Sequence, residues 1–335
     1  MSQHRRLASL VPLVASLLFL PSGARADAPA VMFALQTDLG PTLTGAVQVP
    51  SGMVAGKLVA DGAQVVCADQ PSSLPRLAMV PGQPRPMDID ACRQSVAADV
   101  LAVTIGYQAV AVVTPATASV FPLQSADLFR AVSAHAGAQP VPAVWRDVDP
   151  NLPALPLGML APPADSASTR LLNAYVMEPA CSQQDGARLP FEAASRIEFC
   201  GTLRADPAIV RRTDAQAIAA WAASAPAGQI AVVTLAELRK LDRAVVPLPL
   251  DGALPTAANI ASGHYPAAEA VTLLIVVPHD IAPLRREATR RVVFELTSER
   301  SIGPDGSLAQ AGLVPLPAPE RVAARLKAVA FVEHP

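Results

Sequence analysis

The side chains that commonly carry catalysis are sparse in this sequence and form no known catalytic motif. It contains no Gly-x-Ser-x-Gly elbow, no His-Glu-x-x-His pair and no phosphate-cradling Lys loop, and the histidines at 135, 264 and 279 are scattered. Hydrolysis needs a nucleophile beside a correctly placed base, and no motif here supplies that pair. We therefore predict no catalytic residue, no cofactor and a protein that is not an enzyme.

A short polar stretch offers a different chemistry. Ser166, Ser168, Thr169 and Arg170 stand together where a helix over 168–177 is predicted to begin. Hydroxyl groups, a guanidinium and the outward N–H groups of a first helical turn can all donate hydrogen bonds to an oxyanion. The alternative is that Ser166 or Ser168 only caps the helix, because serine is a preferred N-cap residue.

The first thirty residues have the three-part layout of a cleavable secretory signal. His4-Arg5-Arg6 precede the apolar run 7–20, and Ala24-Arg25-Ala26 form a small-residue cleavage site. The apolar run is about 14 residues long, whereas a helix needs about 20 to span a bilayer. We expect residues 1–26 to be a signal peptide and the mature chain to be periplasmic; a permanent membrane anchor is the alternative.

The charge balance limits the classes of partner. Charged residues make up 16% of the 335 residues, and the formal net charge is −2. Removing the signal peptide takes away three Arg and no acid, which leaves a charge of about −5. No basic surface is available for a phosphate backbone, so nucleic acid is excluded as a partner. A bound anion must be held by local dipoles.

Four cysteines in an exported chain predict two disulfides, for which three pairings exist. Sequence proximity favours Cys67 with Cys92 and Cys181 with Cys200, which close loops of about 25 and 19 residues. Four buried thiols are the alternative. No Cys-x-x-Cys or His-x-x-x-His spacing occurs, so a zinc site or thiol redox chemistry has no support.

Short apolar, β-branched runs alternate with helical patterns along the mature chain, which predicts an α/β fold. Strands are expected at 30–35, 64–67, 100–105, 110–114, 155–160, 229–234, 244–247 and 271–277, and helices at 126–134, 168–177, 214–225, 235–241, 283–297 and 319–331. A mature chain of about 309 residues favours two lobes over a single core. Connections near 115–118 and 246–258 are candidate crossings, so we predict lobe 1 from 27–114 and 251–335, and lobe 2 from 115–250.

Four strings give the chain a resemblance to a known family. Residues 255–266 read Pro-Thr-Ala-Ala-Asn-Ile-Ala-Ser-Gly-His-Tyr-Pro. This resembles the P-T-x-x-N-I-A-S-G-x-Y-P signature of the periplasmic phosphate-binding proteins of phosphate ABC transporters. The strings at 105–107, 147–153 and 306–317 resemble further motifs in the family's order, so the resemblance covers nearly the whole mature chain.

The resemblance implies a two-lobe periplasmic binding protein fold of type II, with two crossing strands and the ligand in the cleft between the lobes. In that family an oxyanion is held without a metal by helix N-termini, hydroxyls and an Arg. The family loop P-P-x-T-S-G-T-R-D corresponds to 162–171, which assigns Ser166, Ser168, Thr169 and Arg170 to the ligand. The resemblance also supports the disulfide pairing chosen above.

Other ligand positions of the family are altered here. Where relatives show G-S-S-T after the first strand, this chain has Leu35-Gln36-Thr37-Asp38, so Thr37 and Asp38 are the candidate contacts. An Asp carboxylate can accept a proton from a monobasic anion but repels a fully ionised one. The family's T-G-T-G-G-G loop corresponds to 58–63, where Gly62 is the one glycine, and Leu171 replaces the acid of the anion loop.

The sequence as a whole predicts a monomeric periplasmic solute-binding protein that captures phosphate or a similar small oxyanion and delivers it to an inner-membrane ABC permease. The alternative is a diverged paralogue without anion capture that acts as an extracytoplasmic sensor or partner protein, which the altered ligand positions motivate. A secreted phosphatase is a third and weaker hypothesis, because fold alone does not determine chemistry.

Overall fold

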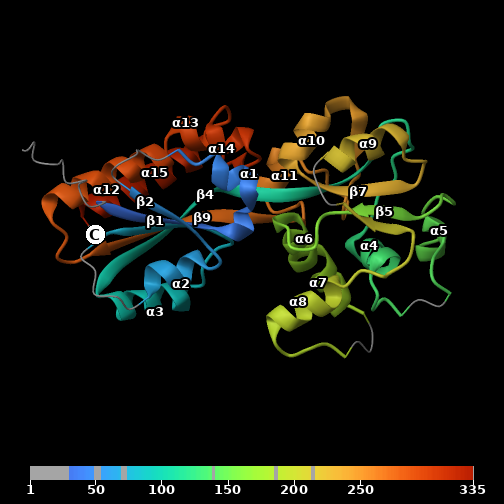
Figure 1. The fold of residues 1–335 in the computed structure, drawn as a ribbon, viewed down its shortest axis with the longest axis horizontal. Coiled ribbons are helices and arrows are strands. Elements are labelled where there is room, and N and C mark those ends of the chain that lie inside the picture. Colours follow the sequence, from blue (N-terminus) through green and yellow to red (C-terminus); the bar gives the residue numbers. More distant parts are fainter. Residues whose placement is uncertain are drawn as a thin grey trace, which may run out of the picture.

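The protein consists of two lobes joined by two long strands. The structure, a computed structural model, describes residues 30–48, 54–68, 74–137, 140–184, 188–212 and 216–334. The predicted signal peptide lies outside these residues. The connecting strands, β4 (Ala98–Pro115) and β9 (Ala268–Pro278), are antiparallel and pair with each other (Figure 1). The predicted α/β class with two lobes and two crossing strands is confirmed.

Lobe 1 is built on a mixed sheet with the strand order β2-β1-β3-β9-β4. Strand β1 is parallel to β2 and β3, whereas β9 is antiparallel to both of its neighbours. Its other strands are β1 (Val31–Gln36), β2 (Val54–Val59) and β3 (Arg76–Pro81). Two pairs of helices cover opposite faces of this sheet (Figure 1): α2 (Gly62–Cys67) with α3 (Pro86–Val96), and α12 (Pro283–Leu296) with α15 (Ala318–Glu333).

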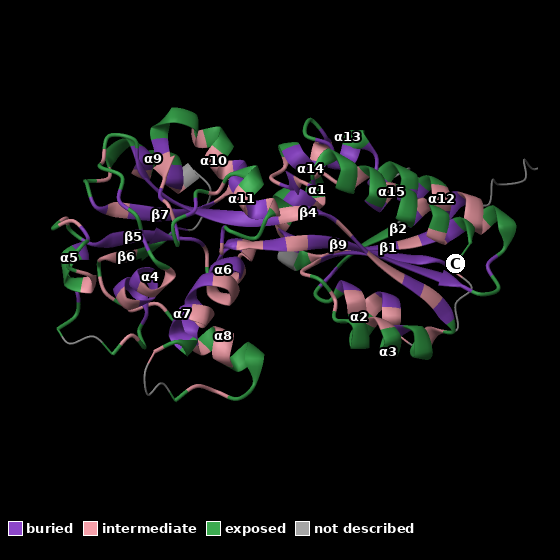
Figure 2. Cartoon of the chain, turned by 180° about the vertical axis from the view of Figure 1, so that it is seen from behind, coloured by how far each residue is buried: buried purple, intermediate pink, exposed green. Residues whose placement is uncertain are grey.

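The two faces of this sheet form separate apolar cores. Successive side chains of a strand point to opposite faces. Along β9, Leu273, Ile275 and Val277 pack into the core with α12 and α15, while Leu274 and Val276 pack into the core with α2 and α3. The strand is therefore buried on both sides, and Figure 2 shows buried strands between helices whose outer faces are exposed.

Lobe 2 continues from β4 into the order β4-β7-β5-β6, and β8 also pairs with β4. Its strands are β5 (Gly158–Ala161), β6 (Ile209–Arg211), β7 (Gln229–Thr234) and β8 (Val245–Pro247). Its helices are α4 (Ser125–Val132), α5 (Trp145–Val148), α6 (Ala167–Leu172), the π-helix η2 (Asn173–Met177), α7 (Glu178–Ser182), α8 (Ala193–Gly201), α9 (Gln216–Ser224), α10 (Leu235–Leu241) and the 3-10 turn η3 (Asp242–Ala244). These elements lie between β4 and β9 in the chain; the lobe limits at 114/115 and 250/251 stay a prediction.

Short elements complete the junction between the lobes. The 3-10 turn η1 (Thr37–Leu39) and helix α1 (Gly40–Gly45) follow β1, while α13 (Glu299–Ile302), α14 (Ser307–Gln310) and β10 (Val314–Pro315) precede α15. The signature string at 255–266 forms α11 (Ala257–Ala261) and the turn before β9. Its Tyr265 is buried and donates a hydrogen bond to the carbonyl of Val110 on β4 at 2.9 Å. This string therefore joins the turn before β9 to the other crossing strand, β4.

Several elements differ from the sequence predictions. The apolar run 64–67 was expected as a strand but belongs to α2, because the Asp61 carboxylate accepts a hydrogen bond from the Gln64 N–H at 2.9 Å and caps a helix there. The runs 100–105 and 110–114 are one strand, β4, whose pairing with β9 is interrupted by a bulge between Thr104 and Gly106. Strands β2 and β3 and helix α3 were not predicted.

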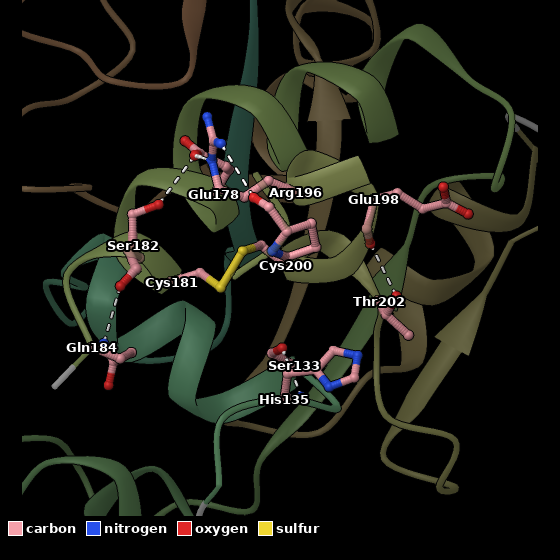
Figure 3. Close-up of a disulfide and its surroundings, with 12 residues drawn as sticks. Ser133, His135, Glu178, Cys181, Ser182, Gln184, Arg196, Glu198, Cys200 and Thr202 are labelled. Carbon is pink, nitrogen blue, oxygen red and sulfur yellow. Dashed lines mark hydrogen bonds and ion pairs between the residues drawn. A yellow bond between two sulfur atoms is a disulfide. The ribbon is translucent and has the colours of Figure 1, made fainter. Parts of the chain in front are cut away.

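Each lobe contains one disulfide, and both predicted pairings are confirmed. Cys67–Cys92 joins α2 to α3 in lobe 1, and Cys181–Cys200 joins α7 to α8 in lobe 2 (Figure 3). An ion pair between Arg196 and Glu178 spans the same two helices of lobe 2. In the chain-entropy model each of these loops adds about 3 kcal/mol to the free energy of unfolding.

Candidate functional site

Residues from both lobes line a cleft of about 390 Å³ beside the crossing strand β4. Lobe 1 contributes the segment 39–43 and Ala311–Gly312. Lobe 2 contributes side chains of the α6 region, of α9 and of α10, and β4 supplies Gln108 and Ala109. A cleft of this size between two lobes is the natural candidate for a ligand site.

The two lobes touch on both sides of this cleft. On one side Gly40 of lobe 1 has a left-handed φ of 78°, and a Cβ there would lie 3.4 Å from the Cβ of Ala167 on α6. On the other side Arg239 on α10 donates a hydrogen bond to the carbonyl of Ala309 in lobe 1. The cleft is therefore bounded by contacts between lobes.

Ser166 and Thr169, two of the predicted ligand residues, use their hydroxyl hydrogens inside the loop. Ser166 is the N-cap of α6 and accepts a hydrogen bond from the Thr169 N–H at 3.2 Å. The Ser166 and Thr169 hydroxyls donate to the Pro163 carbonyl at 2.7 and 2.8 Å. The capping alternative thus describes Ser166, although this residue also lines the cleft.

Ser168 is placed differently from its neighbours. It lines the cleft and is 5% exposed, yet its hydroxyl makes no hydrogen bond within the described part of the chain. The Ser168 hydroxyl is therefore available to a ligand, in contrast to those of Ser166 and Thr169.

Arg170, the predicted guanidinium of the site, is bound to a carboxylate on a crossing strand. It forms an ion pair with Glu269 of β9, whose side chain is 3% exposed. The same carboxylate accepts hydrogen bonds from Gln108 at 2.6 Å and from the Tyr175 hydroxyl at 3.0 Å. Burial and then the charge of Glu269 raise the pKa of Tyr175 to about 12. This network connects lobe 2 to both crossing strands.

A second buried ion pair lies in the cleft wall. Arg212 contacts Glu237 of α10, with Nη2 and Oε2 2.9 Å apart. Thr234 caps α10 and donates to Glu237 through its N–H at 2.8 Å. Burial opposes ionisation of Glu237, but the hydrogen bonds from Arg212 and Thr234 outweigh it and hold the pKa of Glu237 below its ordinary value. The Arg212 charge is thereby neutralised.

Lys240 is the remaining cation of the lining. It lies on the exposed side of α10 and forms no ion pair with any described residue. Thr42 of α1, also exposed, adds a hydroxyl from lobe 1. An anion in this cleft would therefore find Lys240, Ser168 and Thr42 without intramolecular partners in the described structure.

The other two predicted ligand residues precede the lining. Thr37 is exposed in η1 and does not line the cleft, which begins two residues later at Leu39. The side chain of Asp38 lies outside the described part of the structure. Their roles stay predictions.

Sequence reasoning did not assign Gln108, Arg212, Glu237 or Lys240 to the site. The capping-box pattern from Thr234 to Glu237 was a readable signal for the start of α10. Among the described residues, no group of three or more His, Cys, Asp or Glu side chains is arranged to hold a metal ion. In the same part of the chain, every helix is too short or too polar to cross a membrane.

Solved structures of phosphate-binding proteins share this fold. A possible phosphate-binding protein from Planctomyces limnophilus superposes with a TM-score of 0.63 at 12% identity, over 90% of this chain and 98% of the other. The PstS protein from Borrelia burgdorferi gives 0.57 at 13% identity, over 86% and 99%. An ABC-type phosphate transport receptor from Vibrio cholerae gives 0.52 at 14% identity, over 85% and 99%.

These likenesses confirm, at the level of the fold, the resemblance read from the sequence motifs. No protein-family model matches the sequence, and no curated protein matches it. At 12 to 14% identity the similarity shows a common two-lobe architecture and does not fix the ligand.

Proposed function

We propose that this protein is a periplasmic solute-binding protein, which captures phosphate or a similar small oxyanion between its lobes and delivers it to an inner-membrane ABC permease. The fold shared with phosphate-binding proteins supports the class of function. The observation that carries the proposal is a cleft lined by both lobes, in which Ser168 and Lys240 have no intramolecular partner in the described structure.

In the proposed site some of the predicted residues contact the anion, and others position the elements around it. Ser168 donates its hydroxyl to the anion, with Lys240 as the opposing charge. Ser166 and Thr169 hold the start of α6 in place through the N-cap and the hydrogen bonds to the Pro163 carbonyl. Arg170 acts through Glu269, by tying α6 to the crossing strand β9. Thr37 and Asp38 stay candidate contacts from lobe 1, because they directly precede the lining that begins at Leu39.

The proposed location follows from the sequence features together with the fold. A signal peptide cleaved after Ala26 would export the chain, and both disulfides suit an oxidising compartment. We propose a monomer that binds its ligand by lobe closure and carries out no reaction, as expected for a carrier.

Thermal unfolding with a panel of oxyanions tests the proposal. A ligand at a hundred times its Kd stabilises the folded state by about 2.7 kcal/mol and raises Tm by a few degrees. The panel contains phosphate, sulfate, arsenate and phosphonates, with chloride at equal ionic strength as the control. Stabilisation by one of these anions, reduced to about half in Ser168→Ala, is the expected result. An unchanged Tm with every anion would contradict the proposal and favour the paralogue without anion capture.

A further inference from the structure

Apolar side chains dominate the wall of the cleft. Lobe 1 contributes Leu39 and Leu43, and lobe 2 contributes Leu171, Ile218 and Leu235. They come from η1, α1, α6, α9 and α10, so apolar surface faces the cleft from both lobes. Such a lining with a few polar groups is typical of sites for small organic molecules, because the ligand buries apolar surface against the protein.

Few donors remain for the anionic group. A bare inorganic oxyanion gives up its hydration on entering a cleft, and only several charge-assisted hydrogen bonds offset that cost. The hydroxyl hydrogens of Ser166 and Thr169 are already donated to a backbone carbonyl. Among the side chains of the described lining, Ser168, Thr42 and Lys240 have no other partner; the Nε of Arg212 has none either, but it is buried and its guanidinium is paired with Glu237. This set can anchor one anionic head, but it does not surround a tetrahedral ion.

We infer that the ligand is an organic oxyanion, whose anionic head binds at Ser168 and Lys240 and whose alkyl or aryl body packs against the apolar wall. This inference rests on the proposed function and specifies the ligand class of the same cleft. The volume of about 390 Å³ agrees with it, because sites for small organic ligands occupy roughly 300–1,000 Å³. An inorganic oxyanion has five or fewer heavy atoms and leaves most of that space to water.

A series of phosphonates distinguishes the contribution of the apolar body to affinity from that of the anionic head. Calorimetric titration of the purified protein with inorganic phosphate, methylphosphonate, butylphosphonate and phenylphosphonate keeps the head nearly constant while the apolar body grows. Affinity should rise about three- to fourfold for each buried methylene, or on the order of 30-fold from methyl to butyl. Tighter binding of phosphate than of butylphosphonate would overturn the inference and leave the proposed function intact. No binding by any member would overturn the inference, and the sulfate and arsenate arms of the thermal-unfolding panel would then decide the proposed function.

Neighbouring alanines on α9 provide a matched pair of variants. Ala219 and Ala220 are both exposed, but only Ala219 lines the cleft. Ala219→Asn places a neutral polar group against the ligand body and should reduce the butyl-to-methyl affinity ratio several-fold, whereas Ala220→Asn should leave the ratio unchanged. Lys240→Gln should weaken all phosphonates by a similar factor. An unchanged ratio in Ala219→Asn would show that the alkyl body does not contact this wall, which contradicts the inference.

Discussion

Arg170 on α6 and Glu269 on β9 form an ion pair with a buried carboxylate, although their positions in the sequence are 99 apart. The pair joins a short lobe 2 helix to a strand that connects the lobes. Since Gln108 and Tyr175 also donate to Glu269, the carboxylate collects hydrogen bonds from β4 and from η2. The guanidinium predicted to bind the ligand thus holds together elements that frame the cleft, and its contact with a ligand stays a prediction.

A double-mutant cycle on this pair tests its structural role. Arg170→Ala leaves a carboxylate whose side chain is 3% exposed without its counter-charge, and we expect a loss of about 3 kcal/mol in the free energy of unfolding. Glu269→Ala should cost a similar amount. The double variant should lose less than the sum, with a coupling of about 1–3 kcal/mol in urea unfolding.

The exposed pair of Arg85 and Asp88 is the control for this cycle. Its side chains are 72% and 47% exposed, so its coupling should be close to zero. Additive losses for Arg170 and Glu269 would show that their contact contributes nothing to stability.

Ser166 and Ser168 should respond differently to the same substitution. Ser166→Ala removes the N-cap of α6 and should lower the free energy of unfolding by about 1 kcal/mol. Ser168→Ala removes a hydroxyl without an intramolecular partner in the described chain, so stability should change little. The affinity of Ser168→Ala for the anion should fall about tenfold, because the variant loses one hydrogen bond to a charged group. Chemical unfolding and calorimetric titration of both variants make the comparison; the reverse pattern would exchange their roles.

The lowered pKa of Glu237 predicts how the free energy of unfolding depends on pH. Because its pKa is lowered in the folded state, Glu237 contributes stability above its unfolded pKa of about 4.5, and this contribution is lost as the pH falls through the folded pKa. At neutral pH Glu237→Gln leaves Arg212 buried without a counter-charge and should cost about 3–5 kcal/mol. The difference in the free energy of unfolding between this variant and the wild-type protein should shrink as the pH falls below about 4. Urea titrations at a series of pH values measure it, and a pH-independent difference would refute this assignment.

The sequence motifs predicted the fold because they encode packing between neighbouring strands. In the string 105–107, a Cβ on Gly106 would lie 2.7 Å from the Leu313 side chain, so this position needs a glycine. The string 306–317 supplies Leu313 and the strand β10, whose Val314 pairs with Tyr107. Close contacts of this kind restrict which residue type fits at each position. The resulting motif can therefore be recognised in a single sequence.

The site could be predicted only in part, because its chemistry depends on partners from distant segments. The stretch at 166–170 was correctly placed at the start of a helix, and Ser166 and Ser168 line the cleft. The sequence did not show that Glu269 would pair with Arg170, or that the Pro163 carbonyl would accept from two hydroxyls. An apolar wall assembled from five separate elements also leaves no local pattern.

The three tyrosines of the chain predict that the free energy of unfolding falls at alkaline pH. Burial raises the pKa of Tyr107 and Tyr265, and burial with the charge of Glu269 raises that of Tyr175 to about 12. A raised folded pKa contributes stability that is fully present below the unfolded value of about 10 and is lost as the pH rises above it. Tyrosinate absorbance at about pH 10.5 should therefore be lower for the folded protein than in denaturant, where all three ionise near pH 10. Equal absorbance would place the phenols in water and contradict the network at Glu269.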